Sequence, residues 1–256
     1  KRGTPAEWGE RFKATPQYLE VAAYASASPS QPPSTPLPAG RGKGRQVSAF
    51  RQFVILSARN LKIMAQDKVS LALMLLLAPA IGLLDFIWGT KLYDPVEGNA
   101  INIVTMWYMT AIVTILVGSL SSVREIVKEV DIYRRERAVN LKIVPYILSK
   151  IWVGVVLAFY QAGALMLTRL LLNRPVFSGP SAYLALYVTL FLCILCGYLI
   201  GLVISASATN QNAAMIMIIG VLVPQFLFAG VMLPLDLIPG GMAISTIMPT
   251  RWGVEA

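Results

Sequence analysis

The sequence contains no histidine, which excludes a histidine-based metal site, proton relay or general base within this chain. Cysteine is nearly absent too, since Cys193 and Cys196 form a single C-x-x-C motif inside an apolar run. A thiolate or a metal ion is costly in such a run, so the motif favours plain buried thiols over a redox or metal role. Charged residues make up only 14% of the chain. We therefore predict no catalytic residue, metal site or cofactor site within this chain.

Apolar residues are abundant instead. Hydrophobic residues make up 56% of the 256 positions, and the mean hydropathy is +0.63, which is outside the range of ordinary soluble domains. Apolar runs of about twenty residues recur along the chain, and about that length is needed to cross a hydrocarbon core of ~30 Å at ~1.5 Å per residue. The composition therefore predicts an all-α integral membrane protein.

The first 46 residues are polar, and residues 25–45 are rich in proline, serine and glycine. This composition is typical of a flexible linker, and its basic residues predict contact with anionic membrane lipids. The chain begins with Lys1 rather than methionine and shows no secretory signal pattern. We expect it to be part of a longer polypeptide.

The rest of the chain alternates between helical patterns and short polar stretches. Residues 47–68 carry apolar and basic residues on separate helix faces, which predicts an amphipathic helix in the membrane interface. Five spans are predicted at about 69–89, 100–121, 147–172, 182–206 and 213–234. Pro79 and Pro224 lie inside spans and indicate kinks. Residues 235–256 are broken by proline and glycine, which favours a re-entrant or interfacial segment on the outer side.

Lysine and arginine placement predicts the orientation. Eleven of the 22 basic residues lie in residues 1–68 and seven more in residues 122–150. The positive-inside rule makes both regions cytoplasmic, in a multi-pass protein of the plasma membrane. Because five spans leave Ala256 outside, we expect a sixth span beyond it.

The densest charge cluster is "REIVKEVDIYRRER", in which nine of the fourteen residues 124–137 are charged. Both signs are present, and they are interleaved with apolar residues at helical intervals. A helix of this kind offers a protein partner both charged and apolar contacts. It could equally be a solvated loop helix that satisfies its own ion pairs, and the pattern alone leaves both interpretations open.

Three segments carry a resemblance to a known family: "RRERAVNLKIVPYILSK", "FLFAGVMLPLDLIPG" and "IMPTRWGVEA". In this order they resemble the membrane domain of type-2 ATP-binding cassette (ABC) transporters, close to the G-subfamily exporters, over about residues 47–256. The match departs from the family at Met248, where serine is commoner before the proline. The earlier segment "PAEWGERFKATPQYLE" is similar to the connector after the ATPase domain in bacterial proteins that carry both domains in one chain.

The resemblance implies a function for the charge cluster. It makes residues 47–68 the connecting helix and residues 122–146 the coupling region, which contains a helix that docks on the ATPase. Charge-assisted hydrogen bonds at such an interface supply register and stiffness. Glu136 matches the coupling-loop glutamate of the family. The candidate coupling residues are Arg124, Glu125, Glu129, Arg134, Arg135, Glu136 and Arg137.

The resemblance also implies the partners. ATP and magnesium would be bound by an upstream or separate nucleotide-binding domain, so that the complete transporter hydrolyses ATP in the bacterial inner membrane. A second copy of the chain, or a paralogous half, would complete the dimer, and no nucleic acid is expected. A membrane anchor or sensor that transports nothing is the alternative. An ion channel is disfavoured because no span carries a filter-like motif.

Polar and aromatic residues within the second and fifth spans are candidates for a substrate pathway. The family places the central cavity of the dimer between these spans, and polar groups in a membrane need a partner helix or an aqueous cavity. Hydrogen bonding to their own backbone is the alternative. The candidates are Asn102, Thr105, Trp107, Thr110, Thr114, Gln225, Phe226 and Phe228. Lipids, lipid-linked glycans and amphipathic compounds all fit as substrates.

Two further features concern helix packing and charge. Gly197, Gly201 and Ser205 repeat at four-residue intervals, which favours close packing of the fourth span within the chain over a dimer contact. Arg169 lies near the outer end of the third span, where it is expected to extend to lipid headgroups. Asp85 lies near the same interface and need not carry protons.

Overall fold

The computed structural model describes residues 5–16, 18–19, 48–89, 92–94, 98–138, 141–172 and 179–256. Its contacts divide the chain into two units, Lys1–Gln46 and Val47–Ala256. The described part of the first unit contains helix α1 (Pro5–Lys13). Most of the predicted linker, residues 20–46, lies outside the described residues.

The second unit is built from helices. In chain order these are α3 (Ala49–Gln66), α4 (Lys68–Gly82), η1 (Leu83–Trp88), α5 (Ala100–Ser122), η2 (Val127–Glu129), α6 (Val130–Ala138), α7 (Ile143–Leu172), α8 (Pro180–Ser207), α9 (Gln211–Leu227), η3 (Leu235–Leu237), α10 (Gly241–Ile247) and α11 (Pro249–Glu255). No strand occurs among the described residues. The predicted all-α membrane fold is confirmed.

Four helical stretches are long and apolar enough to cross a membrane: Lys68–Trp88, Ala100–Ala138, Ile143–Leu172 and Pro180–Ser207. Helix α9 is apolar but has 17 residues and ends at Leu227, before the predicted end of the fifth span at residue 234. The chain turns there because Gly230 adopts a left-handed conformation with φ of 88°. The fifth apolar helix is therefore shorter than its hydropathy suggests.

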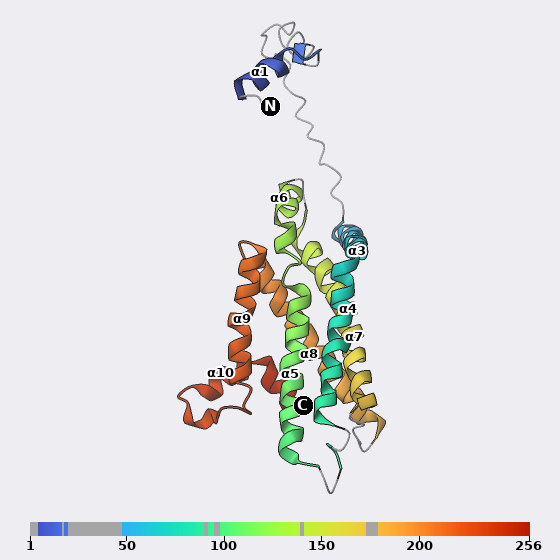
Figure 1. Cartoon of the computed structure of the whole chain (residues 1–256), viewed down its shortest axis with the longest axis vertical. Coiled ribbons are helices and arrows are strands. Elements are labelled where there is room, and N and C mark those ends of the chain that lie inside the picture. Colours follow the sequence, from blue (N-terminus) through green and yellow to red (C-terminus); the bar gives the residue numbers. More distant parts are fainter. Residues whose placement is uncertain are drawn as a thin grey trace. The chain divides into compact units, whose positions relative to one another are not determined.

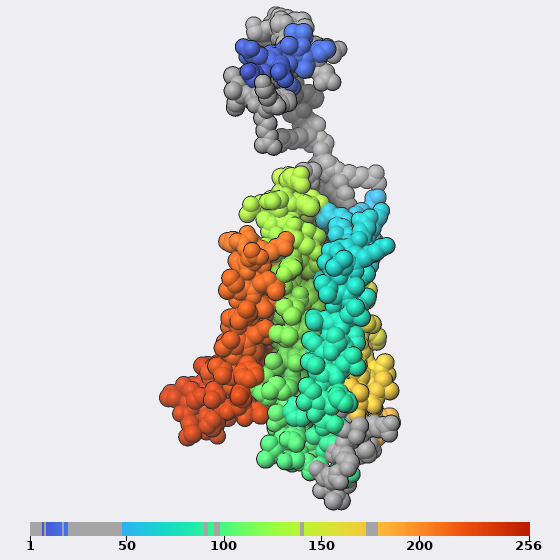
Figure 2. Space-filling view, viewed as in Figure 1, coloured from blue at the N-terminus to red at the C-terminus, as the bar shows by residue number. Residues whose placement is uncertain are grey.

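Figure 1 shows α6 at one end of the second unit, while η1 follows α4 toward the opposite end. We call these the α6 end and the η1 end. In Figure 2, α3 and α4 form a continuous strip along one face, and the segment containing η3 and α10 projects sideways beyond α9. Helices α5, α7 and α8 each run along the unit between these ends, so their termini lie at two separate levels (Figure 1).

The centre of the unit is the contact between α5 and α8. A Cβ atom added at Gly118 would lie 2.0 Å from the carbonyl oxygen of Ile194, and one at Gly197 would lie 2.3 Å from that of Ile115. The Ser119 hydroxyl donates to the Gly197 carbonyl at 3.0 Å. The glycines therefore let the two backbones touch. The prediction that the small residues of the fourth span pack within the chain is confirmed.

Polar residues fix where the helices begin and end. Asp67 closes α3 and caps α4, where its carboxylate accepts hydrogen bonds from the backbone N–H and the hydroxyl of Ser70. These bonds hold the pKa of Asp67 below its ordinary value.

At the far end of the chain, α11 packs against α5, α8 and α9. Gln225 anchors it, because its side-chain oxygen accepts from the backbone N–H of Thr250.

Candidate functional site

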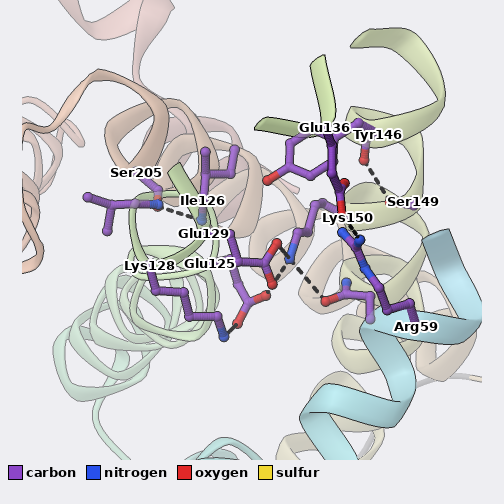
Figure 3. A network of polar contacts seen from close by, with 12 residues as sticks. Arg59, Glu125, Ile126, Lys128, Glu129, Glu136, Tyr146, Ser149, Lys150 and Ser205 are labelled. Atoms are coloured by element: carbon purple, nitrogen blue, oxygen red, sulfur yellow. Dashed lines mark hydrogen bonds and ion pairs between the residues drawn. The ribbon is translucent and has the colours of Figure 1, made fainter. Parts of the chain in front are cut away.

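The candidate functional site is a buried charge network centred on Lys150, near the start of α7. Its side chain is 2% exposed. The ammonium lies 2.9 Å from a Glu129 oxygen and 3.3 Å from a Glu125 oxygen, and it donates to the side-chain Oδ1 of Asn60 at 3.0 Å (Figure 3). A buried ammonium is strongly unfavourable without such partners. Lys150 therefore joins α3, α7 and the segment between α5 and α6.

Charge in the network is balanced. Glu125 also accepts a hydrogen bond from Lys128 at 2.6 Å, so two carboxylates face two ammonium groups. Both glutamates are buried. The backbone that carries them is tied to α8, because the Ser205 hydroxyl accepts hydrogen bonds from the N–H groups of Ile126 and Val127 at 2.9 and 3.0 Å. The segment between α5 and α6 is thus fixed on both sides.

A second ion pair links α3 to α6. The Arg59 guanidinium donates to the Glu136 carboxylate, and both side chains are about one-third exposed. Beside it, the rings of Tyr133 and Tyr146 lie 4.8 Å apart and connect α6 to α7. Together these contacts hold α6 against the same two helices that Lys150 joins.

The contact between α3 and α7 also contains spare polar atoms. Within the described part of the chain, the Ser57 hydroxyl, the Asn60 amide nitrogen and the Tyr146 hydroxyl are buried without a hydrogen-bond partner. Buried polar atoms are normally paired with protein or water. These three atoms therefore retain hydrogen-bonding capacity at the contact between α3 and α7.

The predicted coupling residues fall into two groups. Glu125, Glu129 and Glu136 point into the network. The basic residues are exposed: Arg124, Arg134, Arg135 and Arg137. Sequence reasoning missed the bases that pair with these acids, namely Arg59, Lys128 and Lys150. It also missed Asn60, which accepts from Lys150, and Ser205, which accepts from the backbone of Ile126 and Val127. The one available signal was a lysine placed one turn inside an apolar span.

The candidates for a substrate pathway are only partly brought together. Trp107, Thr110 and Thr114 line one cavity of about 340 Å³ between α5, α8 and α11. Both threonine hydroxyls also donate to carbonyl groups of their own helix. The remaining candidates lie elsewhere. Asn102 is exposed, and the Thr105 hydroxyl donates to the Ile101 carbonyl. The Gln225 side chain accepts a hydrogen bond from Thr250. The Phe226 ring packs on Tyr108, and Phe228 follows the last residue of α9.

The expectation that Arg169 extends to the headgroups is wrong. Arg169 is 3% exposed, and its Nε donates to the Asp85 carboxylate at 3.1 Å. The guanidinium carbon lies 4.6 Å from the centre of the Trp107 ring. Asp85 on η1 supplies a counter-charge inside the helix bundle, which removes the need for the side chain to reach water.

Comparison with known proteins identifies the family to which this architecture belongs. The family model for the ABC-2 type transporter matches residues 51–256, which is most of the chain. The chain is also similar to the ABC transporter ATP-binding/permease protein Rv1747 of Mycobacterium tuberculosis, with 26% identity over 250 residues. That match covers 92% of this chain but only 28% of the relative's length. The chain therefore belongs to the family of ABC-2 type transporter membrane domains.

Proposed function

We propose that this membrane domain is one half of an ATP-driven exporter and that residues 122–146 couple it to a nucleotide-binding domain. Family membership supports a transport role, and the relative's name joins an ATP-binding and a permease function. The observation that carries the coupling proposal is the Lys150 network together with the Arg59–Glu136 pair, because their contacts join α3, α6 and α7. Force applied to α6 then reaches a membrane-spanning helix directly.

The exposed face of α6 is the proposed docking surface. It carries Arg134, Arg135 and Arg137 next to the exposed side chain of Ile132. Basic groups around an apolar contact suit an acidic protein surface, and their charge fixes the orientation of docking. ATP and magnesium would be bound by the nucleotide-binding domain. Closure of that domain would push α6, and the buried pairs would transmit the push because charges in a low-dielectric interior resist separation.

The α6 end is cytoplasmic in this proposal, and the protein lies in the bacterial inner membrane. Two copies, or one copy and a paralogous half, enclose the pathway. Trp107, Thr110 and Thr114 contribute to its wall. A lipid, a lipid-linked glycan or another amphipathic compound is the proposed cargo, because the cavity that these residues line has mostly apolar walls.

The docking surface can be tested by charge reversal. The double variant Arg134→Glu, Arg135→Glu is expected to lower ATP-dependent uptake of a fluorescent phospholipid into inverted vesicles by at least about tenfold, since the loss of two interfacial charge contacts costs more than ~1.4 kcal/mol. Folding should be unchanged because both side chains are exposed. Lys62→Glu is the matched control, because Lys62 is an exposed base on α3 outside the docking surface.

Two outcomes would count against the docking proposal. One is equal uptake in the double variant and the control. The other is a cysteine at position 135 that reacts with a membrane-impermeant reagent only from outside the cell. A membrane anchor or sensor would also leave ATP-dependent uptake undetectable in the unmodified protein, while a nucleotide-binding domain still co-purified with it.

The Arg59–Glu136 pair gives a separate test of transmission. Because each side chain is the ion partner of the other, Arg59→Ala and Glu136→Ala should each uncouple ATP hydrolysis from uptake. The double variant should be no worse than either single one, since a pair that acts as a unit can be lost only once. The ratio of uptake to ATP hydrolysis in the three variants is the measurement. Additive losses would show that the two residues act independently.

A further inference from the structure

A second buried cation lies at the η1 end of the bundle. Arg169 on α7 donates to both carboxylate oxygens of Asp85, from Nε at 3.1 Å and from Nη2 at 3.3 Å. Nη2 also donates to the hydroxyl of Thr110 on α5. The remaining nitrogen, Nη1, is buried and has no hydrogen-bond partner among the described residues. Three helical elements therefore converge on one guanidinium that retains donor capacity.

An unpaired N–H is unfavourable at this position. Burying a polar group without an acceptor costs roughly 1–3 kcal/mol by the measure of protein mutations, and more for a charged group. The face of Trp107 covers part of the guanidinium but provides no lone pair. An oxygen acceptor from outside the chain would complete the site.

Arg169 also lines a cavity of about 270 Å³. The polar lining of this cavity includes Asp85, Thr110 and Thr114 as well. Its other walls are mainly apolar, and several belong to the outer surface of the bundle. Leu84 and Ile87 are 58% and 76% exposed. In a membrane protein such exposed apolar side chains face lipid. A ligand can therefore enter from the bilayer with its polar end inward.

The neighbouring aromatic residues indicate the depth of the cavity. Trp88 ends η1 and lines the cavity, and Tyr93 follows in the next described stretch. Tryptophan and tyrosine gather where acyl chains meet headgroups. Burial raises the pKa of Tyr93, and the positive charge of Arg169 opposes that rise. The mouth of the cavity beside Trp88 thus lies where acyl chains meet headgroups.

From these observations we propose that the cavity binds the phosphate of a membrane phospholipid, with Arg169 Nη1 donating to a phosphoryl oxygen and the acyl chains lying along Leu84 and Ile87. Phosphate is favoured over an ester or a hydroxyl because its anionic oxygens add ion pairing to the hydrogen bond that a guanidinium forms with any acceptor. Guanidinium is also more weakly hydrated than ammonium and suits phosphate geometry. The site does not depend on the proposed coupling function.

Lipid retention tests the site. The full-length protein is purified from cells and washed in detergent to remove bound lipid. It is then incubated with palmitoyl-oleoyl phosphatidylglycerol or with the diacylglycerol that has the same acyl chains. Native mass spectrometry measures how much of each lipid is retained. The phospholipid should be retained at least about tenfold better, as expected for one charged hydrogen bond. In the variant Arg169→Met, Asp85→Leu this preference should fall to less than about twofold, because replacing both charges leaves no unpaired one.

Two further variants make the result specific. Arg251→Met, Glu255→Leu changes another arginine–carboxylate pair in the same way and should keep the preference. Leu84→Trp narrows the cavity from an exposed position and should lose the preference without altering the ion pair. The proposal is overturned if diacylglycerol is retained equally well or if Leu84→Trp, correctly folded, keeps the preference. Displacement of the lipid by an equal concentration of inorganic phosphate would also overturn it, because the ligand would then be a soluble oxyanion.

Discussion

Replacing Lys150 with methionine is expected to lower the free energy of unfolding by about 3–5 kcal/mol, the usual cost of leaving buried charges without their partner. Glu125 and Glu129 are both buried; Glu125 would keep its ion pair with Lys128, whereas Glu129 would lose its ion pair with Lys150. Equilibrium unfolding in mixed detergent and SDS micelles measures the loss. Thermal denaturation followed by size-exclusion chromatography provides an independent value.

Lys128→Met is the matched control. It removes the same type of charge from the same carboxylate, but the Lys128 side chain is 34% exposed and water can replace it. Its expected cost is below about 1 kcal/mol. Equal losses in the two variants would contradict the burial argument. The triple variant Lys150→Met, Glu125→Gln, Glu129→Gln should recover much of the stability while transport stays impaired, which separates folding from coupling.

Gly118→Ala is expected to cost about 3 kcal/mol, at the upper end for overpacking a tight core. The new Cβ would lie 2.0 Å from the Ile194 carbonyl oxygen and 2.7 Å from the Tyr198 nitrogen. Both are backbone atoms, so the atoms cannot move aside unless α5 and α8 separate. The same unfolding measurement tests the loss.

Gly220→Ala tests whether the cost comes from packing. Gly220 also lies inside a helix, α9, but an added Cβ would meet no atom of the described residues within 4 Å. Alanine there should raise stability by up to about 1 kcal/mol through its better helix propensity. A similar loss at both positions would show that helix propensity, rather than the contact between α5 and α8, controls the result.

Most of the fold could be predicted from the sequence because each membrane helix corresponds to a continuous apolar run. Long apolar runs mark α5, α7 and α8, and the repeat of small residues marks the contact of α8 with α5. The end of α9 was less predictable. Hydropathy continues past Leu227, whereas the turn depends on the backbone conformation of Gly230. Hydropathy indicates which residues lie in lipid, but it does not indicate the residue at which a helix ends.

The candidate site was harder to predict because its pairs are distant in sequence. The acids of the network could be identified from their density, and Glu136 from the family resemblance. Their partners could not, since Lys150 meets Asn60 across ninety positions and Arg59 meets Glu136 across seventy-seven. Arg169 was misjudged for the same reason. A cation in an apolar run indicates an unusual environment, but the sequence does not reveal which distant carboxylate neutralises it.

Helix α7 is a single helix of 30 residues with one buried cation near each end. Lys150 and Arg169 are nineteen positions apart, which sets them about 28 Å apart along the axis and about 100° apart around it. If the helix turns as a rigid body, both cations rotate with it. Because α7 is continuous between the two cations, a rigid rotation that separated Lys150 from its glutamates would turn Arg169 relative to Asp85 by the same angle.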